Sequence, residues 1–103
     1  MSAKVIALYN PPSDIAAFDK YYYANHVPVA KTLPGLRRYE VSSGKISDIA
    51  GATPYHLAAT LTFDSMQAIQ AALASPEGAA TAGDLQNFAT GGVSLLMFES
   101  KEI

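Results

Sequence analysis

The sequence predicts one α+β domain in which strands and helices follow the order β-α-β-β-α-β. The chain has 103 residues, a length that supports one hydrophobic core and not two. Half of the residues are hydrophobic and 16% are charged, which indicates a compact module. Segments with alternating apolar residues, typical of strands, are separated by segments in which apolar residues recur at helical spacing. We therefore expect a single domain over residues 1–103.

The first strand is expected at residues 3–9, which are rich in Val, Ile, Leu and Tyr. It stops at Asn10-Pro11-Pro12, because proline cannot continue a strand ladder. A helix is expected next, with Ser13 as its N-cap and Asp14 as an acid in its first turn.

One face of this first helix carries apolar and aromatic residues at helical spacing. Pro28 disfavours helical geometry at Val27, so the helix is expected to end near His26. The residues of the buried stripe are Ile15, Phe18, Tyr22 and, one turn beyond, His26.

Two strands are expected in the middle of the chain. Residues 36–43 predict a strand with Tyr39 and Val41 on one face, and residues 45–54 predict a loop. Residues 55–63 predict a strand with one apolar face and one small, semi-polar face. The apolar face consists of Tyr55, Leu57, Ala59, Leu61 and Phe63, and the other of His56, Ala58, Thr60 and Thr62.

The second helix is expected after Asp64, which forms a capping box with Gln67. Ser75 and Pro76 begin a helical extension, because proline suits the first helical position after a serine cap. This extension is expected to run through Ala82. The buried stripe of the helix consists of Met66, Ile69, Ala72 and Leu73.

The end of the chain predicts a turn and a last strand. Residues 84–89 are expected to form a turn with Leu85 and Phe88 facing inward. The glycines of Thr90-Gly91-Gly92 permit a sharp bend or one wall of a cavity, and residues 93–98 predict the final strand.

The element order is that of the ferredoxin-like plan, an antiparallel four-stranded sheet with both helices on one face. The first and last strands are apolar on both faces, whereas the helices cover only one of them. A second copy of the chain is the simplest cover for the other face, so we expect a homodimer.

Composition excludes several classes of partner. Seven basic and nine acidic residues are scattered along the chain, so neither a nucleic acid nor a membrane is expected as a partner. The absence of cysteine excludes disulfides, thiolate nucleophiles and iron–sulfur clusters. The first residues do not resemble a secretion signal, and the longest apolar run, residues 95–98, is too short to cross a bilayer. A cytoplasmic location is the resulting expectation.

Four segments together resemble the EthD family, named for ethyl tert-butyl ether degradation. They are residues 19–30 (DKYYYANHVPVA), 34–41 (PGLRRYEV), 71–78 (AALASPEG) and 87–93 (NFATGGV). The resemblance implies a dimeric α+β barrel. Relatives with this barrel include cofactor-free monooxygenases, lactone isomerases and polyketide cyclases, and the haem-binding relatives have a larger domain. No cofactor is therefore expected here.

His26 is the foremost catalytic candidate, because imidazole suits acid–base chemistry near neutral pH. It matches the His-Val-Pro motif of the family, although a histidine in a last helical turn also serves a structural role. Tyr22 is expected to face the core, where its hydroxyl either bonds to His26 one turn later or donates to the substrate.

Six further residues are candidates for ligand binding, each with a structural alternative. Tyr21 and Tyr23 flank the helical stripe, and aromatic residues at such spacing also serve as core. His56 is expected to point away from the helices, into the space between subunits or into solvent. A zinc site from His26 and His56 lacks a close-spaced ligand pair. The remaining candidates are Tyr9, Asn87 and Phe88.

The expected function is that of a small-molecule-binding protein acting on a small apolar or aromatic compound. Its enzymatic form is a cofactor-independent monooxygenase or isomerase that uses a histidine as acid or base. The alternative is a non-catalytic accessory or binding protein of an oxidative degradation system.

Overall fold

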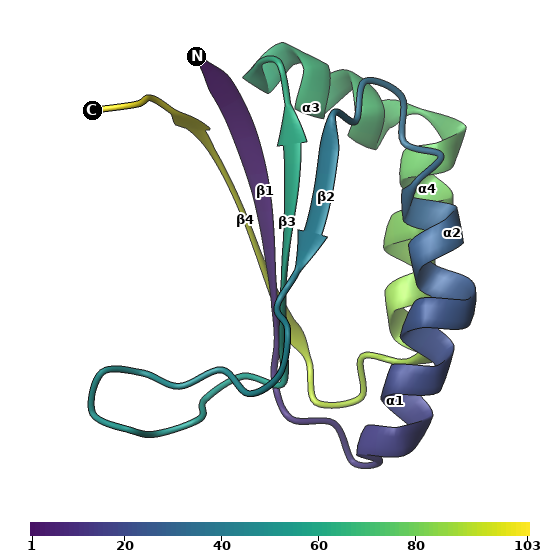
Figure 1. Cartoon of the computed structure of the whole chain (residues 1–103). Helices are drawn as coiled ribbons and strands as arrows, with labels where there is room; N and C mark the ends of the chain where they lie inside the picture. Colours follow the sequence, from purple (N-terminus) through teal and green to yellow (C-terminus); the bar gives the residue numbers. More distant parts are fainter.

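The computed structural model describes residues 1–103 and confirms the α+β, ferredoxin-like plan (Figure 1). Its sheet is antiparallel, with strand order β2-β3-β1-β4, and all helices lie on one face. The strands are β1 (Ser2–Tyr9), β2 (Arg38–Val41), β3 (Leu57–Phe63) and β4 (Val93–Ser100).

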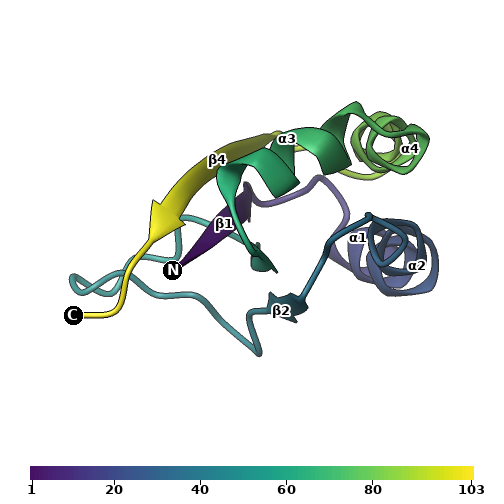
Figure 2. The same ribbon diagram turned by 90° about the horizontal axis from the view of Figure 1, so that it is seen from above.

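The helical layer is made of two rods and one crossing helix. The first rod contains α1 (Ile15–Tyr21), a π-helical turn η1 (Tyr22–His26) and α2 (Val27–Ala30); the second contains α4 (Pro76–Asp84) and a 3₁₀ turn η2 (Leu85–Asn87). The rods lie side by side, and α3 (Met66–Ala74) lies across one end of the sheet (Figure 2). None of these helices has both the length and the hydropathy needed to cross a bilayer.

The expected end of the first helix near His26 is wrong, because the helix continues to Ala30. In the π-helical turn the Val27 N–H donates to the Tyr22 carbonyl, five residues back. Pro28, which has no N–H to donate, then stands in the first turn of α2, directly after the widened turn. Such widened turns occur frequently at functional sites, and here the turn holds Tyr22 and His26, both buried.

Two expected caps are also wrong by one residue. The first helix is capped by Asp14, whose Oδ1 accepts from the Ala17 N–H at 3.0 Å, and Ser13 contacts Thr90 instead. Helix α3 is capped by Ser65 rather than by Asp64. The Asp64 carboxylate instead forms an ion pair with Arg37, with 2.7 Å between Oδ2 and Nη2.

The second half of the chain follows the predicted order of elements, but Leu73, expected on the buried stripe of the helix, is about half exposed. Strand β3 alternates buried and half-buried residues along its whole length. Ser75 caps α4 with Pro76 at its start. The α3–α4 junction needs a glycine at position 78, because a Cβ there would meet the Ala72 carbonyl oxygen at 2.2 Å. The helical extension reaches Asp84, two residues beyond its expected end at Ala82.

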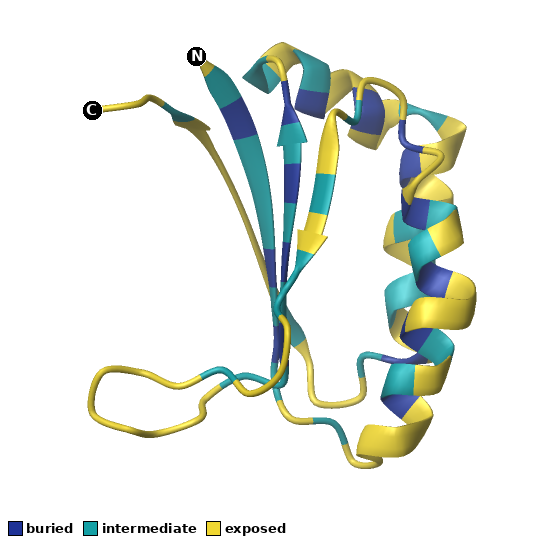
Figure 3. Cartoon of the chain, in the orientation of Figure 1, coloured by how far each residue is buried: buried dark blue, intermediate teal, exposed yellow.

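Strand β4 leaves much apolar surface exposed, since it is an edge strand that the helices do not cover (Figure 3). In the core between sheet and helices, Tyr9, Phe63 and Ile69 are almost fully buried. On β4, by contrast, four consecutive apolar residues are each about half exposed. These residues are Leu95, Leu96, Met97 and Phe98.

Candidate functional site

A cavity of about 90 Å³ lies between the helical layer and the sheet. Its walls are almost entirely apolar, with side chains from β1, β3, α3 and α4. Four polar side chains interrupt them: those of Tyr9, His26, Tyr39 and Thr81. Leu73 and Leu95, which also line the cavity, are about half exposed, so the cavity opens beside them. An apolar pocket with few polar groups is the usual form of a small-molecule site.

His26 is held in this wall by the π-helical turn and by one carboxylate. Its side chain is 4% exposed, and its Nδ1 lies 2.9 Å from Oδ2 of Asp84. Because a carboxylate only accepts, this contact places a hydrogen on Nδ1 and leaves Nε2 free. No fully buried side-chain nitrogen or oxygen lacks a partner, so Nε2 reaches accessible space, and the cavity is the space that His26 lines. The free nitrogen is thus available to a ligand.

Asp84 is fixed by three donors at the junction of α4 and η2. Its Oδ1 accepts from the Tyr21 hydroxyl at 2.6 Å and from the Asn87 amide at 2.9 Å, and its Oδ2 contacts His26. Desolvation raises the pKa of Asp84, but the hydrogen bonds from Tyr21, Asn87 and His26 outweigh it and leave the pKa below its ordinary value. The carboxylate is therefore ionised at neutral pH, where it orients the imidazole through Nδ1.

Sequence reasoning missed Asp84 as a functional residue. It stands 58 positions from His26, too far for any spacing rule to link the two. The available signal was its position: it is the one acid between Glu77 and Glu99, and it precedes Asn87 and Phe88. A lone acid beside other candidate residues deserves inclusion in a predicted site.

Tyr22 is buried as expected, but the expected bond from its hydroxyl to His26 is wrong. The hydroxyl lies 2.6 Å from the hydroxyl of Tyr39 on β2, and only the rings of Tyr22 and His26 are in contact. The widened π-helical turn changes the relative position that Tyr22 and His26 would have in an ordinary α-helix. Desolvation is the main reason that the pKa values of Tyr22, Tyr39 and Tyr9 are all raised, so these phenols stay protonated at neutral pH.

The other helical candidates occupy different places around His26. Tyr21 and Asn87 bind Asp84 and do not line the cavity. Phe88 is buried against the His26 ring, with ring centres 4.6 Å apart. Tyr9 lines the cavity, whereas Tyr23 is half exposed and lines a separate groove.

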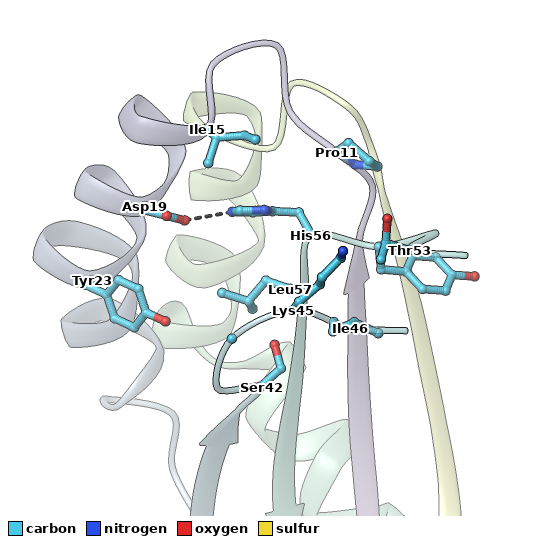
Figure 4. Close-up of a pocket in the computed structure, with 12 residues that line it drawn as sticks. Pro11, Ile15, Asp19, Tyr23, Ser42, Lys45, Ile46, Thr53, His56 and Leu57 are labelled. Carbon is cyan, nitrogen blue, oxygen red and sulfur yellow. Dashed lines mark hydrogen bonds and ion pairs between the residues drawn. The ribbon is translucent and has the colours of Figure 1, made fainter. Parts of the chain in front are cut away.

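The expected direction of His56 is wrong, because it lies on the helical side of the sheet (Figure 4). Its Nε2 is 2.7 Å from Oδ1 of Asp19 on α1, and its ring meets the Phe18 ring edge-on at 4.9 Å. His56 precedes β3, so strand alternation does not fix its side chain. It joins Tyr23 in the second, open groove rather than the cavity of His26.

The two histidines pair with different carboxylates. Nowhere in the chain do three His, Cys, Asp or Glu side chains gather closely enough to hold a metal ion. Instead, each histidine contacts one aspartate: His26 contacts Asp84 and His56 contacts Asp19.

Comparison with known proteins places the chain in a family. The model of the EthD domain matches residues 10–92. An uncharacterised 11.0 kDa protein of the thcB–thcC intergenic region of Rhodococcus erythropolis is 39% identical over 101 residues, covering 97% of this chain and 96% of that protein. An EthD family protein from Bacillus halodurans is 32% identical, with a TM-score of 0.89 over 98% of this chain and all of the other.

More distant solved structures share the fold. SnoaB, a cofactor-independent oxygenase from Streptomyces nogalater, is 15% identical with a TM-score of 0.69, covering 99% of this chain and 95% of that one. A dimeric ferredoxin-like protein of unknown function from Thermobifida fusca is 16% identical with a TM-score of 0.69, covering 95% and 90% of the two chains. At these identities the likeness concerns the fold alone.

Proposed function

The chain belongs to the EthD family, and on this premise we propose that it binds a small apolar molecule in the cavity and exchanges a proton with it through His26. The feature that supports this most is the imidazole of His26, which lines the apolar cavity, is held at Nδ1 by Asp84 and has no hydrogen-bond partner at Nε2. An imidazole oriented by an ionised carboxylate is a common general base.

The proposed step moves one proton. Nε2 of His26 takes it from an O–H of the ligand or from a C–H next to a carbonyl, and the ligand becomes an anion. The resulting imidazolium is stabilised by the Asp84 carboxylate at 2.9 Å. Isomerisation returns the proton to another atom of the ligand.

Cofactor-free oxygenation begins with the same anion and uses O₂ as the oxidant. A CH₂ group becomes a carbonyl: one oxygen atom of O₂ enters the ligand, and the other leaves with the two hydrogens as water. SnoaB is described as an oxygenase of this cofactor-independent type, which supports the proposal at the level of the fold.

The volume of the cavity limits the ligand. About 90 Å³ is well below the roughly 300–1,000 Å³ of pockets that hold drug-sized ligands. We therefore propose a compact molecule, or the apolar end of a longer one that leaves the cavity beside Leu73 and Leu95. The alternative function is a non-catalytic accessory role, in which the protein binds a ligand in the same cavity without proton transfer.

Hydrogen–deuterium exchange of cyclopentanone in D₂O tests the proton transfer. We expect the protein to accelerate loss of the α-proton signals above the buffer rate, His26→Ala to abolish the acceleration, and Asp84→Asn to reduce it. His56→Ala is the matched control and retains it. Equal rates for the wild type and His26→Ala contradict the enzymatic role; cavity binding without exchange supports the accessory role.

We also propose that two copies of the chain cover the exposed residues of β4 for each other. The apolar residues Leu96 and Phe98 lie on the face that no helix covers, and the Thermobifida fusca neighbour is described as dimeric. Sedimentation at micromolar concentration is expected to show a dimer that Leu96→Asp converts to monomer. Ile15→Asp on α1, at a similarly exposed site, leaves the dimer intact. A wild-type monomer overturns this proposal.

A further inference from the structure

A second, larger groove lies away from the cavity of His26. Its volume is about 460 Å³, within the range of small-molecule sites. Three stretches that are distant in sequence form most of it: one side of α1 and η1, the segment that follows β2, and the residues that lead into β3 (Figure 4). No residue lines both this groove and the cavity, so the two spaces have separate chemistry.

The His56–Asp19 pair forms one firm wall of the groove. Besides the 2.7 Å contact with Asp19, the His56 backbone N–H donates to the Tyr9 carbonyl at 2.8 Å. Its side chain is 18% exposed, and that of Asp19 is 46% exposed. Because the carboxylate accepts from Nε2, the neutral imidazole keeps Nδ1 as a free acceptor. A ligand hydroxyl is the natural donor to it.

Lys45 supplies the one ammonium group of the groove. No carboxylate lies within ion-pair distance of it, since Asp19 engages His56 and the remaining ion pairs involve other residues. Figure 4 shows the Lys45 side chain among the residues that line the groove with His56. Ser42 accepts from the Ala58 N–H, which leaves its own hydroxyl hydrogen to donate. These groups suit an anion.

The remaining walls are apolar and aromatic. Ile15 and Tyr23 contribute large side chains that are 56% and 52% exposed, so both are accessible to a ligand in the groove. Ile46 and Leu57 face them across the groove. An aromatic ring fits between such walls through apolar contact and through stacking on Tyr23.

From these features we infer that the groove is a second binding site, for a small aromatic carboxylate that bears a hydroxyl group. The carboxylate pairs with Lys45, the ring contacts Ile15 and Tyr23, and the hydroxyl donates to Nδ1 of His56. This site does not depend on proton transfer at His26, so either proposal can fail alone.

Titration of the ¹⁵N-labelled full chain with 4-hydroxybenzoate tests the site. We expect saturable amide shifts in residues 15–23, 42–46 and 53–57. Lys45→Gln is expected to raise the Kd about fivefold, the upper effect of an exposed ion pair. Benzoate, which lacks the hydroxyl, is expected to bind about fivefold more weakly, as for the loss of one hydrogen bond.

The controls separate this site from general anion binding. Lys101→Gln and His26→Ala leave the Kd unchanged, and the neutral 4-hydroxybenzyl alcohol loses the contribution of Lys45. His56→Gln removes the preference for 4-hydroxybenzoate over benzoate. The inference is overturned by an absence of saturable shifts in the groove, by shifts confined to the cavity of His26, or by a Kd that Lys45→Gln does not change.

Discussion

The protein contains two His–Asp pairs of similar geometry in unlike surroundings. In the His26–Asp84 pair both side chains are largely buried, and two further donors hold the carboxylate. In the His56–Asp19 pair the carboxylate is 46% exposed and has no second side-chain donor. The two pairs therefore differ in their surroundings and not in the contact itself. The buried pair suits proton transfer, and the open one suits recognition of a polar ligand.

Removal of the two carboxylates provides the sharpest test of this contrast. Asp84→Ala leaves His26, Tyr21 and Asn87 without their acceptor, and we expect a loss of about 2–4 kcal/mol of unfolding free energy. Asp19→Ala breaks a half-exposed contact, with an expected loss below about 1 kcal/mol. Urea unfolding of the two variants measures both values. Equal losses contradict the distinction.

The buried surroundings of His26 extend to the paired hydroxyls of Tyr22 and Tyr39. Tyr22→Phe leaves the half-buried Tyr39 hydroxyl without its partner, at an expected cost of about 1–2 kcal/mol. Tyr39→Phe should cost a similar amount, whereas the double variant should lose much less than the sum of the two. Additive losses in this double-mutant cycle show that the two hydroxyls do not interact.

The raised pKa values of the same tyrosines lead us to expect that the unfolding free energy falls at alkaline pH. Because burial raises the pKa of Tyr9, Tyr22 and Tyr39 above the ordinary value of 10.0, the folded chain retains protons that the unfolded chain releases. Their contribution is complete below pH 10 and declines as the pH rises above it. Unfolding free energies measured from pH 8 upward check this, and Tyr22→Phe should flatten the decline.

A smaller effect is expected in acid. The pKa of Asp84 lies below its ordinary value of 3.8, so its contribution is present above that pH and is lost as the pH falls through the lower folded value. Asp84→Asn should therefore reduce the slope of stability against pH below about 4. Acid titrations of the wild type and the variant, followed by circular dichroism, compare the slopes; identical slopes contradict the assignment.

Much of the fold could be predicted because local patterns determine it. Alternation along β3 assigned Leu57, Ala59 and Leu61 to the core, and Ser75-Pro76 marked the start of α4. The continuation of the first helix past Pro28 could not be predicted, since a π-helical turn lacks a distinctive local pattern. The prediction therefore ended the helix near His26, four residues early.

The candidate site was less predictable, because its contacts join distant parts of the chain. His26 was found from its position on the helical stripe and from its motif. Its partner Asp84 and the Tyr39 hydroxyl come from other elements, and only tertiary packing brings them together. His56 was placed on the wrong side because it stands just outside the strand whose alternation was used.

Two phenylalanine rings stand between the histidines. Phe18 touches His56 edge-on and lies 5.2 Å from Phe88, which in turn packs on His26. A substitution at position 18 is therefore felt by both binding spaces simultaneously. A mutation that adapts the cavity of His26 to a new ligand is therefore constrained by the groove of His56, and the reverse. We expect the residues that line the two spaces to change together among descendants of this chain.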